Sequence, residues 1–471
     1  MRTGPLLFFG SALVVLAAQL FLPPVVGVAN NGDFSKAYGM FNLTMPVQDE
    51  ARFATTTFTF DSHMYYWARY YSSELLLVPP ALALSAVVSK DGAFDLRCMG
   101  LIHASLFLVA LYLFAPIVEA LSARLRVMLC AFVLIIYGDV MYVSYLNSFY
   151  MDVATYLFLL LAVVCYLRVL RWHRPKDFAL FALFSVLLVT SKAQHATLGL
   201  WIALLVWLTR RSLLGERFQF RGMLAAVLVS VLSVGWAGWS TPPDYAAKGC
   251  FTVVFYRILP GARNVDQTLA DLGLNASWKS FIGMHCYSDG ARMEDPAFVR
   301  VVRQKLSYGV LARFFLTHPR DAYVALRKSL DEAGRQRPAL GNFDASAGRP
   351  AFAESRAFAF WSDAKRALFW QRGSRFLNCY VALAAATLML IWMQRENLPA
   401  GALAAGIALV GMASTELGIA SLADAADIPR HHFIFYALAD LLVLTSFFLV
   451  AGLCARCMGQ WTRRLRHTVW P

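Results

Sequence analysis

Charged residues are scarce in this sequence: Asp, Glu, Lys and Arg make up 15% of its 471 residues, against about 25% in a typical soluble domain. The chain also lacks a spaced cysteine and histidine pattern of the kind that binds a metal, and it lacks a nucleic-acid-binding motif. These absences exclude an ordinary set of soluble domains and a nucleic acid partner. We predict no cofactor and no essential metal, with a divalent metal left open.

Long apolar runs take the place of charge. Hydrophobic residues make up 59% of the chain, and several runs exceed the roughly 17 residues that a helix needs to cross a bilayer. The sequence therefore predicts an all-α, polytopic membrane protein of about ten transmembrane helices. The ten runs cover residues 6–28, 99–120, 127–142, 153–170, 178–190, 196–208, 223–239, 376–393, 398–419 and 433–453.

The net charge is +14, and the Lys and Arg residues fall mainly between these runs, where they predict the orientation of the chain in the membrane. Residues 75–88 form a shorter apolar run that Pro79 and Pro80 interrupt, so we expect it to lie on the membrane surface; if it spanned, the count would be eleven. With this run outside the bilayer and a cytoplasmic N-terminus, every short cytoplasmic segment is basic, as the positive-inside rule requires. Residues 30–98 and 240–375 are then predicted to lie outside.

This topology divides the chain into three parts. Residues 1–239 form an N-terminal transmembrane module that includes the outside loop 30–98, and the first run is read as an uncleaved helix. Residues 240–375 are expected to form a small, mainly helical extracytoplasmic domain, and residues 376–471 the last helices with a basic cytoplasmic tail. We expect a bacterial inner (plasma) membrane protein surrounded by membrane lipids, with its polar groups facing the periplasm.

Cys250 and Cys286 flank a polar stretch in the segment placed outside. An oxidising compartment would preserve a disulfide between them, and the sequence leaves open whether it forms.

Two groups of candidate residues follow helices at the predicted outer surface. Asp33 follows the first run, where a carboxylate can act as a general base; the alternative is a turn that merely ends the helix. Asn147, Tyr150 and Asp152 lie in a tyrosine-rich connection, and carboxylates at this depth tend to be functional. The alternative there is an aromatic belt with Asp152 as a helix cap.

Two further groups place cations on the outer side, against the positive-inside bias. Lys192 and Gln194 lie in one short connection, and Arg430 and His431 lie in another. Such cations suit the binding of a lipid phosphate, whereas the alternative for Lys192 is a snorkelling side chain. Glu416 lies inside an apolar run and needs a partner, for which Arg430 is one candidate.

Together these residues resemble the GT-C superfamily of membrane glycosyltransferases, which take sugars from polyprenyl-phosphate donors. The resemblance covers most of the chain and rests on the predicted architecture and on short motifs. An acidic residue near the start of the first outside loop is the base in this scheme, and Asp49–Glu50 supply a later acidic pair. The motifs are Asn30–Phe34, Phe94–Arg97, Asn147–Tyr150, Leu340–Asn342 and Arg430–His431.

The resemblance implies an inverting transfer of a sugar from a polyprenyl-phosphate donor to a glycan, lipid or protein acceptor. Asp33 would be the catalytic base, and the donor phosphate would be held by Lys192, Arg430 and His431. A transporter or flippase of lipid-linked saccharides competes with this interpretation, as does a glycan polymerase or ligase. The implied substrate-binding residues are Arg97, Asn147, Tyr150, Asp152, Gln194 and Asn342.

Overall fold

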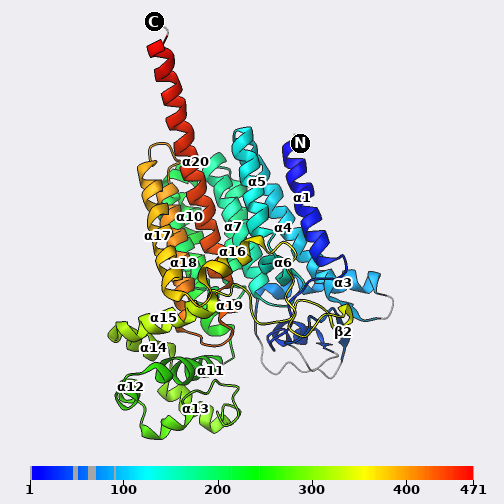
Figure 1. Cartoon of the computed structure of the whole chain (residues 1–471), viewed down its shortest axis with the longest axis vertical. Helices are drawn as coiled ribbons and strands as arrows, with labels where there is room; N and C mark the ends of the chain where they lie inside the picture. Colours follow the sequence, from blue (N-terminus) through cyan, green and yellow to red (C-terminus); the bar gives the residue numbers. More distant parts are fainter. Residues whose placement is uncertain are drawn as a thin grey trace.

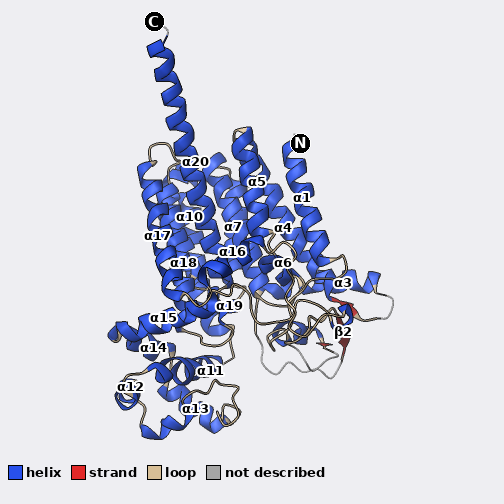
Figure 2. Cartoon of the chain, viewed as in Figure 1, coloured by secondary structure: helices blue, strands red, loops and turns tan. Residues whose placement is uncertain are grey.

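The computed structural model is mostly helical and describes residues 3–45, 51–61, 70–89, 92–213, 215–242 and 244–469. Long helices stand side by side in a bundle, and short helices, strands and loops gather at one end of it (Figures 1 and 2). We call this the Asp33 end. Both chain termini lie at the opposite end (Figure 1).

The bundle helices follow the apolar runs of the sequence, with their ends set by polar residues, glycine and proline. The first ends at Leu20, ahead of Pro23 and Pro24, because proline removes a backbone donor and restricts the chain. The helices are α1 (Thr3–Leu20), α4 (Leu96–Glu119), α5 (Ala123–Tyr137), α6 (Val140–Leu146), α7 (Asp152–Trp172), α8 (Pro175–Val189), α9 (Leu198–Leu213), α10 (Gly215–Trp239), α17 (Gly373–Met393), α18 (Ala402–Leu422) and α20 (Phe433–Val469).

A polytopic membrane architecture is confirmed, but the count of long spans is smaller than the count of apolar runs. Within the described residues, six helices are long and apolar enough to cross a membrane, or seven if α5 and α6, which bend by 62°, form one span. The runs at α8 and α9 give helices of 15 and 16 residues, which are slightly longer than the predicted runs but shorter than the other bundle helices counted as spans. In α1 the described apolar part covers Leu7–Leu20.

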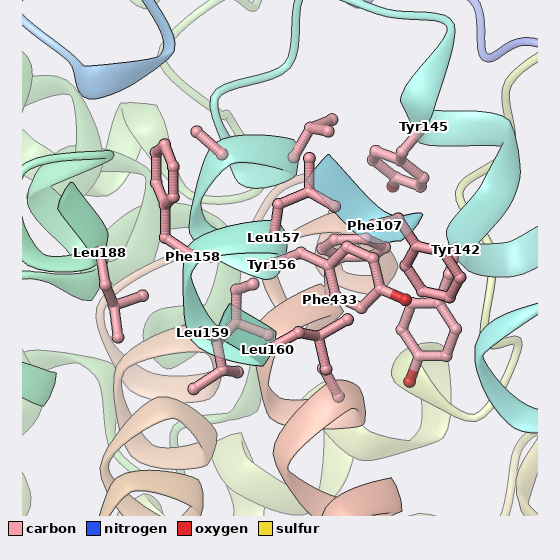
Figure 3. Packing of buried hydrophobic residues seen from close by; sticks show 14 of the residues in the cluster. Phe107, Tyr142, Tyr145, Tyr156, Leu157, Phe158, Leu159, Leu160, Leu188 and Phe433 are labelled. Atoms are coloured by element: carbon pink, nitrogen blue, oxygen red, sulfur yellow. The ribbon is translucent and has the colours of Figure 1, made fainter. Parts of the chain in front are cut away.

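Helix α7 forms the centre of the bundle, since 83% of its apolar window is buried. Tyrosines that the sequence suggested for an aromatic belt pack here instead (Figure 3). The rings of Tyr142 and Tyr156 stack with centroids 5.1 Å apart, and those of Tyr145 and Phe433 are 4.3 Å apart. The Tyr142 hydroxyl donates to Asp440 Oδ2 at 2.6 Å, so this ring belongs to the core.

At the Asp33 end, a small antiparallel sheet departs from the all-α expectation. Its strands β1 (Leu43–Thr44), β2 (Thr57–Phe60) and β3 (Phe94–Asp95) lie in that order. Beside it, α3 (Val78–Val88) lies across the direction of the bundle helices (Figure 1). Pro79 and Pro80 lie in its first turn, so they begin this helix and do not interrupt it.

A second group of helices below the bundle has its own buried cluster, which includes Phe251, Phe255, Val302 and Leu311. In contrast, Leu330 and Ala333, in the helix that follows this group, are buried with the bundle core. The group comprises α11 (Tyr245–Thr252), the π-helical turn Val253–Ile258, α12 (Val265–Asp271), α13 (Pro296–Lys305) and α14 (Tyr308–Thr317), and is followed by α15 (Pro319–Ala333) and α16 (Phe360–Phe369).

Cys250 and Cys286 both lie in this second buried cluster, and both thiols are free. The disulfide that the sequence left open is therefore not formed in the structure.

Candidate functional site

Four segments that are far apart in the sequence meet at the Asp33 end. They are the loop that carries Asp33, the first residue of α7, the turn after α8, and α19 (Ile428–His431). Ion pairs and hydrogen bonds join Asp33, Asp152, Lys192 and Arg430. We call these four residues, with the groups directly bonded to them, the charge cluster.

Arg430 lies at the centre of the charge cluster, with only 4% of its side chain exposed. Its Nη1 is 2.8 Å from Asp33 Oδ2 and 3.5 Å from Asp152 Oδ2, and its Nε donates to Asp427 Oδ2 at 2.6 Å. Burial lowers the pKa of the guanidinium, but Asp33, Asp427 and Asp152 outweigh burial and raise this pKa well above its ordinary value. A permanent cation is thus held against three carboxylates.

Asp152 joins the other cations to this centre. Lys192 Nζ donates to both Asp152 oxygens, at 2.9 and 3.1 Å, and His195 Nε2 lies 3.4 Å from Oδ1. The other nitrogen of His195 is 2.9 Å from both Glu416 oxygens. The buried partner of Glu416 is therefore His195, and the pairing with Arg430 suggested by the sequence is wrong, because Arg430 is already occupied by the three aspartates.

Asp33 is the more accessible carboxylate, with 23% of its side chain exposed against 1% for Asp152. Lys36, one turn further along the chain, donates to its Oδ1. Burial raises the pKa of the Asp33 carboxyl, but Lys36, Arg430 and Lys192 outweigh burial and hold this pKa well below its ordinary value. Asp33 is therefore an ionised carboxylate that a substrate can reach.

The loop that presents Asp33 is shaped by Asn30 rather than by Asp33 itself. Asn30 Oδ1 accepts from the backbone N–H groups of Gly32, at 2.9 Å, and Phe34, at 3.0 Å. Gly32 has a φ of +98°, which other residues rarely adopt. Helix α1 ends at Leu20, so the alternative role of Asp33 in ending that helix is wrong.

Gln194 and His431 form a clamp beside the cluster. Gln194 Nε2 donates to the His431 carbonyl at 3.0 Å, and its Oε1 is 3.1 Å from His431 Nδ1. His431 Nε2 is 3.1 Å from Asp424 Oδ2. Burial and the positive charges of Arg430 and Lys192 lower the pKa of His431 well below its ordinary value, so its imidazole is neutral near pH 7.

Tyr150 is hydrogen-bonded to the backbone of the Asp33 loop. Its hydroxyl donates to the Ala29 carbonyl at 2.9 Å and accepts from the Asn31 N–H at 3.1 Å, while the Arg430 guanidinium lies 5.1 Å from its ring centroid. Tyr150 thus joins the loop to Arg430 through the backbone and a cation–π contact.

The remaining predicted substrate-binding residues lie outside the charge cluster. Asn147 donates to the carbonyls of Leu20 and Val26, at 3.0 and 2.9 Å. Arg97 is paired with Asp95. Asp49–Glu50, the later acidic pair, lie outside the described residues.

Asn342 holds two chain segments together. It donates to the Gly27 carbonyl at 2.7 Å and accepts from the Ser355 N–H at 3.0 Å, and its side chain is buried. We expect Asn342→Ala to lower the free energy of unfolding by about 2 kcal/mol, because it leaves buried backbone groups unpaired. Thermal unfolding of the purified protein checks this against Asn397→Ala, an exposed position where we expect no change. An unchanged midpoint for Asn342→Ala would contradict this structural role.

Several groups at the site were not predicted. Lys36 lies 5.4 and 5.2 Å from the ring centroids of Tyr70 and Tyr245 as well as bonding Asp33. Its spacing of three residues from Asp33 was the available signal. Asp427 has the same spacing from Arg430, whereas nothing in the sequence links the distant Tyr245 to this site.

The cations and carboxylates of the cluster balance one another in ion pairs. Within the described ranges, no group of three or more His, Cys, Asp or Glu side chains is arranged to hold a metal ion. The cluster combines an accessible carboxylate with two buried cations at the Asp33 end of the bundle. It can accept a proton and attract an anion in one place.

No curated protein and no solved structure matches the chain significantly. The profile of one family, described as the YfdI N-terminal transmembrane domain, matches residues 3–463. This match covers nearly the whole chain and agrees with the apolar helices in indicating a multi-pass membrane protein. The chain belongs to the YfdI N-terminal transmembrane domain family.

Proposed function

We propose that this protein is an inverting glycosyltransferase that moves a sugar from a polyprenyl-phosphate donor to a glycan, lipid or protein acceptor. The observation that carries the proposal is the contact of the accessible Asp33 carboxylate with the buried Arg430, at 2.8 Å. A transfer from a lipid phosphate needs a base for the acceptor hydroxyl and a cation for the phosphate. Both are present at the same point.

The proposed orientation places the charge cluster on the periplasmic side. Both termini lie at the opposite end of the bundle (Figure 1), so the chain crosses an even number of times. Ten crossings, with α1, α8 and α9 as short spans, meet this condition. The basic segments around Arg124, Arg171 and Arg395 then lie in the cytoplasm, in agreement with the positive-inside rule.

In the proposed reaction, Arg430 and Lys192 attract the donor phosphate while its polyprenyl chain remains in the bilayer. The acceptor hydroxyl oxygen attacks the anomeric carbon from the face opposite the phosphate, and its proton passes to Asp33. The bond between the anomeric carbon and the phosphate oxygen breaks, and its electron pair leaves with polyprenyl phosphate. The two cations stabilise the charge that develops on this leaving group.

Donor binding also prepares the base. The phosphate adds negative charge beside Asp33 and competes for the cations that lower the pKa of this carboxyl. Asp33 therefore becomes more basic when the donor is bound, so the proton acceptor is strongest when the donor is in place.

A panel of polyprenyl-phosphate sugars, offered to the purified protein in lipid together with its own cell envelope extract, tests the proposal. We expect one donor to give a glycosylated product whose anomeric configuration is opposite to that of the donor. A product with retained configuration would contradict the direct displacement.

The pH dependence of the same reaction tests the role of Lys36. Asp33 must be ionised to act as a base, so the rate falls as pH drops through its pKa. Lys36→Met removes a positive charge that lowers this pKa, so we expect the acid limb of the rate profile to move to higher pH. Lys279→Met, at an exposed pair with Asp266, serves as the control. Identical acid limbs in both variants would count against Asp33 as the base.

A further inference from the structure

A cavity of about 610 Å³ lies at the Asp33 end, apart from the charge cluster. It is formed where α1 ends, where α4 begins and where the chain enters β2, with the segment 344–349 completing the wall. Figure 1 shows β2 just below the ends of α1 and α4. The lining residues are Pro23, Pro24, Val25, Thr56, Arg97, Asp344, Ser346, Ala347, Gly348 and Arg349.

The cavity carries two guanidinium groups. Arg349 is exposed, its guanidinium lies 5.8 Å from the ring centroid of Phe343, and it makes no ion pair with any residue that the structure describes. Arg97 bonds to Asp95 through contacts of 2.6 to 3.0 Å, yet 48% of its side chain remains exposed. Both groups therefore have donors that can face a ligand in the cavity.

The one carboxylate in the lining does not neutralise either arginine. Asp344 Oδ1 accepts from the N–H and the hydroxyl of Ser346, at 2.9 and 2.7 Å, and its Oδ2 accepts from the Thr56 hydroxyl at 3.0 Å. Its role is to shape the wall by fixing the turn at residues 345–347. Counted with Asp95 and Asp344, the two arginines leave no net charge. What the cavity offers an anion is the exposed Arg349 guanidinium, which is in no ion pair with a described residue, together with the exposed nitrogens of Arg97.

The position of the cavity relative to the bilayer narrows the ligand class. Arg97 lies in the first turn of α4, a helix long and apolar enough to span, and Pro23 and Pro24 follow the end of α1. The cavity is therefore at the level of lipid head groups, with an apolar wall of two prolines and Val25. Free anions in water would gain nothing from that apolar wall, whereas an amphiphile would.

We propose that this cavity is a second binding site, for the phosphate head group of an anionic lipid, separate from the donor phosphate site at Arg430. Arg97 and Arg349 bind the phosphate oxygens, and the proline wall contacts the first apolar carbons of the lipid. The site is defined by binding alone, and it does not depend on the transfer reaction.

The backbone joins this site rigidly to the Asp33 loop. Gly27 N–H donates to the Asn342 carbonyl at 3.0 Å, and Ala29 N–H donates to the Gly341 carbonyl at 2.8 Å. The segment from Val25, in the cavity wall, to Asp33 is therefore anchored by backbone hydrogen bonds at Gly27 and Ala29. Eight residues separate the two ends, which limits their distance to about 29 Å even in a fully extended chain.

Counting the bound lipids tests the proposal. The full chain is placed in phosphatidylcholine nanodiscs, polyprenyl phosphate is added as the probe, and native mass spectrometry gives the number of copies bound and their affinities. We expect Arg349→Gln to weaken the cavity site about tenfold and the double variant Arg97→Gln/Arg349→Gln about a hundredfold. Arg356→Gln, an exposed arginine in the same loop and outside the cavity lining, is the matched control.

The two sites are distinguished by their own variants. Two copies on the wild type, with one remaining in the double variant and one in Arg430→Gln, support both sites. One copy on the wild type that only the double variant loses supports the cavity and contradicts the donor site. Displacement of the cavity copy by phosphatidylglycerol supports a lipid phosphate site. Equal binding by the double variant and Arg356→Gln, or displacement by an equal concentration of inorganic phosphate, overturns the proposal.

Discussion

Asp33→Asn is expected to reduce sugar transfer by about 10³-fold while donor affinity stays within a few fold of the wild type. The amide has nearly the shape of the carboxylate and can still accept a hydrogen bond from Lys36 or Arg430, but it cannot take the proton of the acceptor hydroxyl. Removing a negative charge beside the donor phosphate does not weaken donor binding. Single-turnover transfer and donor binding, measured separately, give the two quantities.

Asp427→Asn is the matched control for this prediction. Asp427 also bonds to Arg430, at 2.6 Å, and its side chain is 22% exposed against 23% for Asp33. If charge near Arg430 were all that mattered, both variants would lose similar activity. We expect the control to lose less than about tenfold, because in the proposed reaction Asp427 neutralises Arg430 and takes no proton. Equal losses would remove Asp33 from its role, and the base would then have to be Asp49, Glu50 or Asp152.

Arg430→Gln is expected to weaken donor binding about a hundredfold and to lower the free energy of unfolding by about 3–5 kcal/mol. The substitution leaves Asp33, Asp152 and Asp427 without their shared cation, and Asp152 is almost fully buried. Arg430→Lys should restore part of the stability and less of the donor binding, because an ammonium group cannot make the forked contacts of a guanidinium. Donor titration and chemical unfolding in the same lipid give both numbers.

The control for the stability effect is Arg327→Gln, at a half-exposed pair whose ions are 3.8 Å apart. Exposed pairs contribute little, so we expect a change of at most about 0.5 kcal/mol there. If Arg430→Gln unfolds no more readily than Arg327→Gln, Arg430 does not stabilise the carboxylates around it. The ion pairs of the charge cluster would then be wrong.

The sequence drew attention to the two cations of the charge cluster because Lys and Arg in segments predicted to lie on the outer side of a membrane protein are uncommon. Lys192 and Arg430 stood out against the bias, and the structure places both beside Asp152. The pairing inside the cluster could not be predicted. Glu416 and His195 are 221 residues apart, and only the packing of α18 against the turn after α8 brings them within 2.9 Å.

The polar residues and the glycine in two of the short motifs, Leu340–Asn342 and Asn147–Tyr150, have structural roles. At Gly341, an added Cβ would lie 2.0 Å from the Arg52 carbonyl oxygen, so this close approach of two backbones requires glycine. Asn342 then ties the same segment to Gly27, and Asn147 ties the turn after α1 to the end of α6. A motif alone does not distinguish a residue that binds substrate from one that holds the chain, and in these two cases the hydrogen bonds are with backbone.

The number of membrane crossings was also difficult to predict from the sequence. Apolar composition located each helix, but a crossing depends on helix length, and α8 and α9, with 15 and 16 residues, fall just below the roughly 17 residues that a span needs. The bend of 62° between α5 and α6 occurs at Gly138–Asp139, where Asp139 caps the second helix by accepting from the Met141 N–H. A hydropathy plot does not show such a break.

The most direct test separates transfer from transport. Purified wild-type protein in sealed liposomes receives a labelled polyprenyl-phosphate sugar and an acceptor extract, and both the release of polyprenyl phosphate and the movement of intact donor across the bilayer are measured. We expect one polyprenyl phosphate to be released for each sugar transferred, with the intact donor remaining in its leaflet. Movement of intact donor across the bilayer without any transfer would contradict the glycosyltransferase proposal and establish the transporter instead.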